Sequence, residues 1–345
     1  MGDIPAKDPN IDKVFTVRAG KFRRYHGQGW RQLLDVKTNL LNLRDGIFVL
    51  VGLVQSWRLL RAIRPQVIFV KGGFVGVPVG LAAARLKIPF VTHDSDSIPG
   101  LANRIIGRWA SVHAVALPKG VYDYPQDKTE TVGIPLSSHF EYVTPALKKH
   151  YRTLLKVPQA APMIFVIGGG LGAQRVNHAV AQAIPHLMQE FPNLYVVHGV
   201  GRANHAVMEQ EYARNLTEAQ APRLEVKDFI SDVYRYGGAA DIVITRAGAT
   251  NLAEFAMQGK ACVIIPSPYL TSGHQTKNAE FLRDAGAGVV LSESELAEDP
   301  NRLAKQLSTL LKDTKLQQSL GEKLHEFAHE DAAHRLAMLL LRQAK

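Results

Sequence analysis

The stretch "DIVITRAGATNLAEFAMQGKACVIIP", from Asp241 to Pro266, contains two apolar runs separated by a glycine turn and a helix-length segment. This order of elements is typical of a parallel α/β unit. The turn allows two interpretations. Either Asn251 caps the helix and Glu254, three residues later, closes a capping box, or the turn binds an anionic, ribose-bearing ligand at the helix N-terminus.

The same alternation extends along most of the chain. Apolar, β-branched runs end in glycine or small polar turns and are separated by helix-length segments, which indicates parallel sheets covered on both faces. The sequence therefore predicts an α/β, doubly wound fold. The runs that we expect to form strands are QVIFVKGG, PFVTHDSD, VHAVALP, MIFVIGGG, LYVVHGVG, DIVITRAG and ACVIIPSP.

The length of the chain bears on its domain organisation. Because 345 residues exceed the usual size of a single core, we expect two domains. The alternation lapses in a polar, proline-containing stretch, residues 137–161, as is typical of a domain junction. We expect residues 1–155 to form an N-terminal domain, residues 156–315 a C-terminal domain, and residues 316–345 C-terminal helices.

The first residues lack the strand, glycine-rich turn and helix with which a doubly wound domain normally begins. Residues 1–17 read MGDIPAKDPNIDKVFTV, with two prolines and no glycine turn of that type. We expect that the first βα unit is missing because the chain is a fragment of a longer protein. The alternative is that something else supplies the function of this unit.

Positive charge is concentrated in the N-terminal third of the chain. Residues 1–120 carry a net charge of +11, whereas residues 121–345 carry −1. Such a basic segment suits nucleic acid, an anionic membrane surface or an anionic substrate. We expect no nucleic-acid partner, because the basic segment shows no aromatic interleaving of the kind that stacks bases.

An apolar run within the basic segment favours the membrane surface. The run IFVLVGLV, residues 47–54, continues into a segment with Trp57 and with Arg58, Arg61 and Arg64 at three-residue spacing. A basic stripe on a largely apolar helix is typical of an interfacial segment, although a core helix with a solvated arginine edge has the same pattern. The run is far shorter than the ~18 residues that suggest a spanning helix, so we expect peripheral association.

Several classes of site find no support in the sequence. The only cysteine, Cys262, lies in the apolar run KACVIIP, so neither an intrachain disulfide nor a cysteine metal site is expected. Neither G-x-S-x-G nor G-x-x-x-x-G-K occurs. A serine hydrolase or a P-loop ATPase is therefore not indicated.

Two further glycine turns follow predicted strands. They are VKGGFVGVP, residues 70–78, and VIGGGLGAQRVN, residues 166–177. Glycines at such turns let backbone N–H groups approach an anion closely, but tight packing of a helix on a strand explains them equally well. In open parallel sheets, ligands bind beyond the carboxyl ends of the strands, which is where these turns are expected.

An acidic loop follows the predicted strand at PFVTHDSD. It contains His93, Asp94 and Asp96 within the segment THDSDSIPGLANR. Asp94 or His93 is a candidate general base. Alternatively, Asp94 and Asp96 chelate a divalent cation, or Asp96 or Ser97 simply caps the next helix.

Seven segments, taken in order between about residue 65 and residue 291, resemble one family. They are KGGFVGVP, THDSDSIPGLANR, VGIPL, IGGGLGAQRVN, VKDFISDV, DIVITRAGATNLAEFAMQGKACVIIPSP and HQTKNAEFLRDAGAGVVL. The family is that of the N-acetylglucosaminyltransferases of the MurG type, which add the second sugar to the lipid-linked precursor of peptidoglycan. The resemblance implies two facing doubly wound domains of GT-B architecture, with the nucleotide sugar held by the C-terminal domain and the lipid acceptor by the N-terminal one.

The resemblance also implies roles for individual residues. Glu254 matches the carboxylate that binds the ribose hydroxyls of UDP, and the turn Ala249–Asn251 lies along the diphosphate. The implied donor-binding residues are Gly248, Ala249, Thr250, Asn251 and Glu254, Phe229 and Ile230 at the uracil, His274 and Gln275 at the sugar, and Gly170 and Asn177 in the second glycine turn. The implied acceptor-binding residues are Gly72, Gly73, Phe74 and Asp96.

Some positions depart from the pattern of the family. They are Gly170 in place of a serine, Leu171 of a glutamine, Ser137 of an arginine, Asp94 of a glutamate, Asp96 of an asparagine and Phe74 of a tyrosine. The family also has an N-terminal glycine-rich loop that ends in a histidine and grips the acceptor pyrophosphate. Residues 1–30 contain no counterpart, since His26 in RYHGQGW follows no predicted strand.

The implied activity is inverting transfer of N-acetylglucosamine from UDP to a sugar hydroxyl of an undecaprenyl-diphosphate acceptor, at the cytoplasmic face of the membrane. Asp94 or His93 would remove the hydroxyl proton, and the helix start at Gly248–Asn251 would stabilise the departing UDP. We expect no cofactor and no metal. The alternatives are a related transferase with another acceptor, and a non-catalytic chain that holds nucleotide sugar or membrane and needs a partner subunit.

Overall fold

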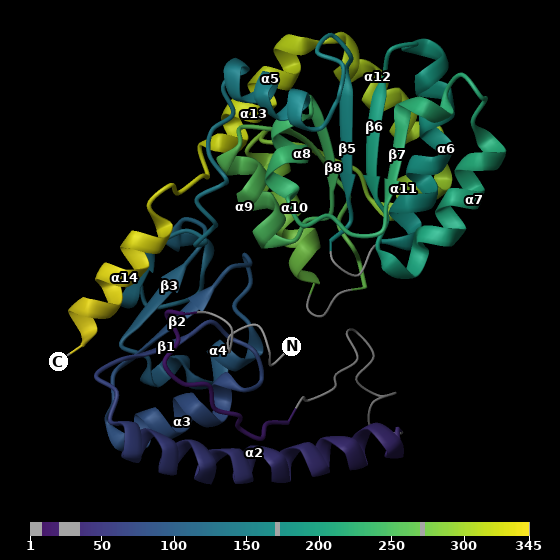
Figure 1. Ribbon diagram of the computed structural model, residues 1–345. Helices are drawn as coiled ribbons and strands as arrows, with labels where there is room; N and C mark the ends of the chain where they lie inside the picture. The colour runs from purple at the N-terminus through teal and green to yellow at the C-terminus, as the bar shows by residue number, and fades with distance from the viewer. Residues whose placement is uncertain (1–8, 21–34, 170–172, 270–272, 345) are drawn as a thin grey trace. The chain divides into compact units, whose positions relative to one another are not determined.

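The fold consists of two units, each built around a parallel sheet (Figure 1). The computed structural model describes residues 9–20, 35–169, 173–269 and 273–344. The first unit comprises the described residues up to Asp94, together with Pro99–Thr131 and the C-terminal residues from Arg335. The second unit comprises Ser95–Ile98 and Val132–His334. The predicted α/β, doubly wound architecture is confirmed.

The first unit contains a four-stranded sheet of order β1-β2-β3-β4, in which every pair is parallel. Within the described residues, its strands are β1 (Ile68–Val70), β2 (Phe90–Asp94), β3 (Val112–Val115) and β4 (Thr129–Thr131). Its helices are α2 (Val36–Ile63), α3 (Gly76–Leu86), α4 (Leu101–Ile106) and most of α14 (Ala332–Gln343), with short 3-10 turns at 107–109, 119–121 and 126–128.

The core of this unit combines large and small apolar side chains. Phe90 and Ile106 are fully buried, and they pack with Leu60 of α2 and with Ala82 of α3. A Cβ atom at Gly80 would lie only 2.7 Å from Cδ1 of Ile106, so α3 and α4 can approach this closely only because position 80 is glycine.

Helix α2 is longer than the apolar run that the sequence displays. It spans 28 residues, and Asp35 caps its start by accepting a hydrogen bond from the backbone N–H of Thr38 at 3.0 Å. Its segment Thr38–Ile63 is long and apolar enough, by length and composition alone, to cross a membrane. The uninterrupted apolar run at residues 47–54 predicted too short an apolar segment. Polar residues on either side interrupt the run, but the helix as a whole remains largely apolar.

The second unit contains a six-stranded parallel sheet of order β10-β9-β8-β5-β6-β7. Within the described residues, its strands are β5 (Met163–Ile167), β6 (Tyr195–Gly199), β7 (Leu224–Lys227), β8 (Ile242–Thr245), β9 (Ala261–Ile264) and β10 (Val289–Val290). Its helices are α5 (Pro145–Leu154), α6 (Gln174–Glu190), α7 (His205–Asn215), α8 (Val233–Ala239), α9 (Ala249–Met257), α10 (His274–Asp284), α11 (Glu293–Glu298), α12 (Arg302–Lys312) and α13 (Thr314–His325).

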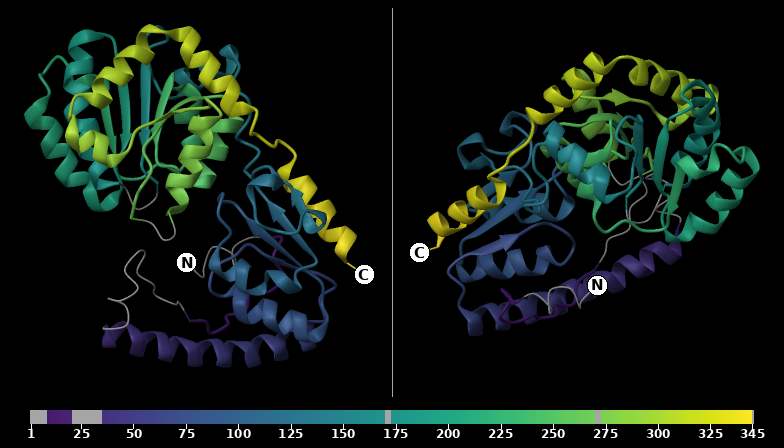
Figure 2. Two further views of the ribbon diagram at one scale, coloured as in Figure 1. Left: turned by 180° about the vertical axis from the view of Figure 1, so that it is seen from behind. Right: turned by 45° about the horizontal axis from the view of Figure 1, so that its top comes forward.

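Successive residues of the central strands contribute to different cores. Ile164 and Val166 face a core shared with α6 and α12, whereas Met163 and Phe165 face a core shared with α8, α9 and α10. All four side chains are fully buried. Figures 1 and 2 show these two sets of helices on opposite faces of the sheet. The near-continuous apolar runs of the sequence thus correspond to strands covered on both sides.

The polar stretch 137–161 differs from the sequence-based expectation. It contains helix α5, which begins after Thr144, whose hydroxyl accepts a hydrogen bond from the backbone N–H of Leu147 at 3.2 Å. The second unit begins at Val132, whereas we expected a boundary near residue 155. The expected C-terminal helices are α13, which packs in the second unit, and α14, most of which lies in the first.

Candidate functional site

The turn after β8 differs from a capping box. Helix α9 begins at Ala249, its N-cap is Gly248 in an extended conformation, and no side chain of the described residues caps it. Asn251 is therefore the third residue of the helix, and its Nδ2 atom donates a hydrogen bond to Oγ1 of Thr245 at 3.3 Å. The capping-box interpretation is therefore wrong.

Glu254 lies within α9, next to the buried side chains of Leu252 and Phe255. It is half-buried, and burial raises its pKa from 4.5 to about 7. Among the described residues, its carboxylate forms no ion pair and accepts no side-chain hydrogen bond. A half-buried, ionised carboxylate that accepts no hydrogen bond destabilises the folded protein. Two hydroxyl groups of a ligand would supply the missing hydrogen-bond donors.

The predicted uracil segment follows β7. Ile230 is buried, and its Cδ1 atom would lie 3.1 Å from a Cβ atom placed on Gly199, so the glycine at the end of β6 makes room for it. Phe229 is exposed, and the guanidinium carbon of Arg202 lies 5.0 Å from the centre of its ring. An exposed aromatic ring beside a cation can stack on a planar base.

Two predicted sugar contacts begin helix α10, after Gly273 in the left-handed conformation. The Oε1 atom of Gln275 accepts a hydrogen bond from the backbone N–H of Ser267 at 2.9 Å. The Nε2 atom of Gln275 would lie 3.9 Å from a Cβ atom on Gly248, so it adjoins the start of α9. In the described residues, the Nδ1 atom of His274 is buried without a hydrogen-bond partner. The starts of α9 and α10 therefore lie together.

The two predicted residues of the second glycine turn have different outcomes. Gly170 lies outside the described residues. Asn177 is fully buried. Its Nδ2 atom donates a hydrogen bond to the carbonyl oxygen of Val200 at 2.9 Å, and its Oδ1 atom lies 3.2 Å from Nε2 of His198. Its side-chain amide is thus engaged within the protein, where it fixes the loop after β6.

Asp94, a candidate general base, is buried in the first unit. Its Oδ1 atom accepts hydrogen bonds from the backbone N–H of Gly100 and from Nδ2 of Asn103, both at 2.9 Å, and its Oδ2 atom accepts one from the hydroxyl of Tyr124 at 2.9 Å. Burial raises its pKa, although these hydrogen bonds oppose the rise. Asp94 therefore holds the loop before α4, and Asn103 and Tyr124 are functional candidates that we did not predict.

The other candidate base, His93, is 1% exposed, and its ring centre lies 6.1 Å from that of Phe69. Gly72 and Gly73 follow β1 with φ values of 98° and 81°, which other residues rarely adopt. A Cβ atom on Gly72 would lie 3.6 Å from Nδ2 of Asn103. The glycine turn after β1 therefore adjoins the loop after β2, and the side chain of Phe74 beside it is exposed.

Asp96 belongs to the second unit. Its Oδ1 atom accepts a hydrogen bond from Nδ2 of Asn278 at 2.9 Å, and its Oδ2 atom lies 3.9 Å from Nδ1 of His274. Asn278 also donates to the carbonyl oxygen of Ala247 at 3.1 Å, which is next to the start of α9. No group of three or more His, Cys, Asp or Glu side chains in the described ranges could hold a metal ion.

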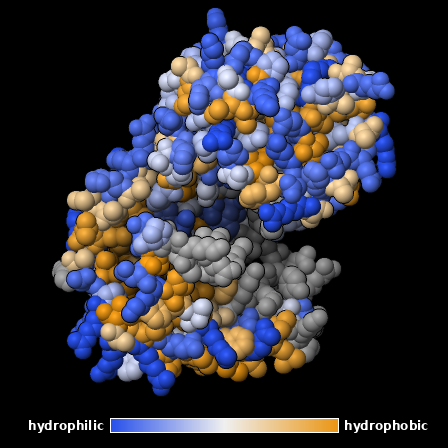
Figure 3. Space-filling model, in the orientation of Figure 1, coloured by the Kyte–Doolittle hydropathy of each residue, from blue (hydrophilic) through white to orange (hydrophobic). Residues whose placement is uncertain are grey.

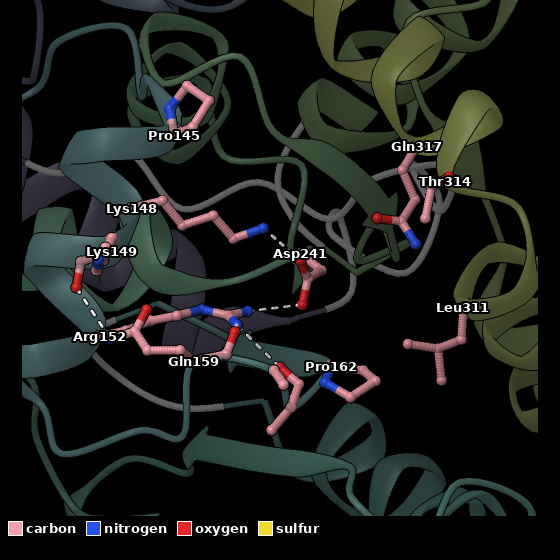
Figure 4. A pocket seen from close by; sticks show the side chains of 12 residues that line it. Pro145, Lys148, Lys149, Arg152, Gln159, Pro162, Asp241, Leu311, Thr314 and Gln317 are labelled. Carbon is pink, nitrogen blue, oxygen red and sulfur yellow. Dashed lines mark hydrogen bonds and ion pairs between the residues drawn. The ribbon is translucent and has the colours of Figure 1, made fainter.

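A separate cavity of about 580 Å³ lies at the amino ends of β5 and β8, away from the starts of α9 and α10 (Figure 4). Lys148 and Arg152 of α5 both point at Asp241, the residue before β8. Asp241 also accepts a hydrogen bond from the backbone N–H of Met163 at 2.7 Å. These contacts join α5 to two strands, so this cluster accounts for the position of the helix.

Comparison with known proteins adds to this geometry. Residues 26–115 match the glycosyltransferase family 28 N-terminal domain, and residues 163–336 match the glycosyltransferase family 28 C-terminal domain. The chain is 33% identical over 295 residues to the UDP-N-acetylglucosamine–N-acetylmuramyl-(pentapeptide) pyrophosphoryl-undecaprenol N-acetylglucosamine transferase of Geotalea daltonii, covering 85% of this chain and 77% of that protein. It is 32% identical to the protein of the same name from Geobacter sulfurreducens, covering 82% and 75%.

Solved structures are also similar to this chain. The crystal structure of MurG from Acinetobacter baumannii superposes with a TM-score of 0.69 at 27% identity, over 86% of this chain and 79% of that one. A glycosyltransferase of kitacinnamycin superposes with a TM-score of 0.64 at 16% identity, a similarity of fold alone.

Proposed function

We propose that this chain, which belongs to the N-acetylglucosaminyltransferases of glycosyltransferase family 28, transfers N-acetylglucosamine from UDP to the N-acetylmuramyl-(pentapeptide) pyrophosphoryl-undecaprenol acceptor of peptidoglycan synthesis. The observation that carries this proposal is the start of α9, where, as far as the structure describes the chain, an uncapped helix N-terminus and a carboxylate without a partner, that of Glu254, occur together. A nucleoside diphosphate offers both a negative charge for the helix end and a ribose diol for the carboxylate.

The transfer requires two kinds of stabilisation. As the acceptor hydroxyl attacks the anomeric carbon, it loses a proton and forms a new glycosidic bond, while the bond from the sugar to UDP breaks with inversion. The backbone N–H groups at Gly248–Asn251 would stabilise the charge on the departing diphosphate. Gln275, which adjoins Gly248, would contact the sugar ring.

We retain Asp94 and His93 as the candidate groups that receive the proton. A raised pKa makes the carboxylate of Asp94 a stronger base than an ordinary aspartate. Because both oxygens of Asp94 already accept hydrogen bonds, direct transfer requires that one donor, such as the Tyr124 hydroxyl, moves away. Gly72, Gly73 and Phe74, which adjoin this loop, would contact the acceptor.

The first test is a transfer assay. We expect release of UDP from UDP-N-acetylglucosamine and formation of the disaccharide only when the lipid-linked N-acetylmuramyl-pentapeptide is present. Glycosylation of a different acceptor at a higher rate would indicate the alternative of a related transferase. Binding of UDP-N-acetylglucosamine without transfer to any acceptor would indicate the alternative of a binding chain that needs a partner subunit.

We also propose that the protein associates with the cytoplasmic face of the membrane through α2. One face of this helix packs on the core of the first unit, through Leu60 among others. The opposite face carries exposed apolar side chains at spacings of three and four residues, namely Leu40, Leu43, Ile47, Leu50 and Val54. This outer stripe lies along the apolar band over α2 in Figure 3 and continues toward the exposed arginines Arg58, Arg61 and Arg64. An apolar stripe followed by cations suits an anionic lipid surface.

Replacement of Leu43 and Ile47 with glutamate should reduce retention of the protein by liposomes that contain anionic lipid. Each substitution places a charge on the face that would enter the lipid, so we expect a loss of roughly tenfold or more. Co-sedimentation at low and high salt measures the effect, and salt should weaken wild-type retention. Val207→Glu on α7 is the matched control, because Val207 is as exposed as Ile47, at 55%. Equal retention of the double variant and the wild type would contradict the assignment.

A further inference from the structure

A network of four charged or polar side chains crosses the carboxyl edge of the second sheet. Glu293 is at its centre, with Oε1 at 2.6 Å from Nη2 of Arg246 and Oε2 at 2.9 Å from Nη1 of Arg175. Nη1 of Arg175 also donates a hydrogen bond to the hydroxyl of Tyr269, and its guanidinium carbon lies 4.6 Å from the centre of that ring. None of these four residues was predicted from the sequence.

The members of the network each follow a different strand of the sheet. Arg246 directly follows β8 and stands two residues before Gly248, whereas Arg175 lies in the first turn of α6, after β5. Tyr269 follows β9, and Glu293 is the first residue of α11, after β10. Because carboxyl ends of parallel strands share one edge of the sheet, the network lies at the same edge as the start of α9.

The two arginines are held differently. Arg246 is nearly buried, at 10% exposure, and its other Nη atom donates to the carbonyl oxygen of Ile265 at 3.1 Å, so its guanidinium is used within the protein. The side chain of Arg175 is 61% exposed, and within the described part of the chain its ion pair and hydrogen bonds involve Nη1 only. Its Nε and Nη2 groups therefore remain available to a ligand.

The charges of the network do not cancel. Glu293 is 6% exposed and carries one negative charge, which faces two guanidinium groups. One positive charge remains in excess, at an edge where the N-terminus of the 17-residue helix α6 adds a further positive potential. Because the buried carboxylate of Glu293 fixes the guanidinium of Arg175 in position, the excess positive charge is in place before a ligand binds.

We infer that Arg175, which Glu293 and Tyr269 orient, binds the diphosphate of the nucleotide sugar. This inference rests on the function proposed above. A guanidinium offers paired N–H groups that match phosphate oxygens. The second role of the network is to hold the segment that contains Tyr269 against the start of α6. Arg175 thereby supplies a side-chain cation to a ligand that the start of α9 contacts through backbone N–H groups.

The experiment compares ligands that differ only in phosphate content. Calorimetry on the full chain measures the affinity of wild type, Arg175→Gln and Arg175→Lys for uridine, UMP and UDP. We expect Arg175→Gln to weaken UDP binding by roughly tenfold or more, because a charge-assisted hydrogen bond is lost, and to leave uridine binding unchanged. Arg175→Lys should retain part of the UDP affinity at low salt, because it keeps the positive charge but not the paired N–H groups of the guanidinium.

The matched control is Arg283→Gln, because Arg283 is also an exposed helical arginine, at 56%, and pairs with a neighbouring carboxylate, Asp284. It should bind all three ligands as the wild type does. Tyr269→Phe keeps the ring beneath Arg175 and removes only the hydroxyl, so it should weaken UDP binding less than Arg175→Gln. Thermal unfolding of each variant shows whether the fold persists.

Three results would overturn the inference. Equal weakening of uridine and UDP binding by Arg175→Gln would make Arg175 a structural residue, and unchanged UDP affinity would make its contacts an ordinary surface ion pair. In both cases a wild type that binds UDP, and a Glu254 variant that binds it less tightly, would leave the proposed function standing. A wild type that binds neither UDP nor UDP-N-acetylglucosamine would overturn both.

Discussion

Replacement of Glu254 with glutamine should stabilise the protein at pH 8 and weaken its binding of UDP-N-acetylglucosamine. Burial raises the pKa of Glu254 from 4.5 to about 7. Above pH 7 the folded protein must therefore hold an ionised, half-buried carboxylate that has no donor among the described residues. Glutamine has nearly the same shape and carries no charge, so it removes this unfavourable contribution.

The effect on stability should depend on pH in a defined direction. Because the pKa is raised on folding, Glu254 favours the folded state most below its unfolded pKa, and this contribution is lost as pH rises toward 7. The free energy of unfolding of Glu254→Gln should therefore exceed that of the wild type by about 1–3 kcal/mol at pH 8 and by much less at pH 5. Urea unfolding at both pH values measures this difference.

The same substitution should reduce the affinity for UDP-N-acetylglucosamine by about 1–3 kcal/mol, because the ribose hydroxyls lose a charged acceptor. Glu218→Gln is the matched control, since Glu218 is exposed, and it should change neither property. If Glu254→Gln were no more stable than the wild type at pH 8, the carboxylate would have an unrecognised partner. Unchanged affinity would remove Glu254 from the donor site.

Asp241→Asn should be strongly destabilising, by about 3–5 kcal/mol, because it leaves two cations close together without their counterion. Burial alone would raise the pKa of Asp241, but the charges and hydrogen bonds of Lys148 and Arg152, together with the backbone N–H of Met163, outweigh burial and lower it. The side chain of Arg152 is only 5% exposed, so water cannot replace the lost carboxylate well.

Urea unfolding at pH 7 tests this expectation, with Asp284→Asn as the control, since the side chain of Asp284 is 68% exposed. Because the pKa of Asp241 is lowered on folding, its contribution is present above its ordinary value of 3.8 and is lost as pH falls through its lower folded pKa. The variant that still folds should bind UDP normally, because the cluster lies at the amino ends of the strands. A change in stability below 1 kcal/mol would show that the cluster contributes little.

The sequence predicted the inner strands of both sheets because their signal is local, but it missed β4, β7 and β10, which lie at sheet edges. Met163–Ile167, for example, is a short, wholly apolar run followed by a turn, and its apolar character on both faces indicates the covering helices. The glycine turns and the strand–turn–helix around Glu254 also follow from order along the chain. The position of α9 could not be read so closely, because asparagine followed three residues later by glutamate matches a capping box even inside a helix.

The missed features depend on contacts between distant residues. Helix α5 has little apolar character and is held by Arg152, which contacts Asp241 and the carbonyl oxygens of Ala239, Gln159 and Ala161. The cap at Thr144 followed by Pro145 was a readable helix start. The contact of Tyr124 with Asp94, and that of Glu293 with two arginines, left no local pattern at all. Such partners are found only when the loops at one sheet edge are brought together.

The sharing of β5 between two cores has a consequence for how the second unit opens. Met163 and Phe165 cannot leave one core unless Ile164 and Val166, on the same short strand, are withdrawn from the other. Neither layer of helices can therefore melt independently at the centre of the sheet, and the two faces should be lost in one cooperative step. A ligand bound at the carboxyl edge of these strands would then protect both layers from hydrogen exchange, including helices that it never touches.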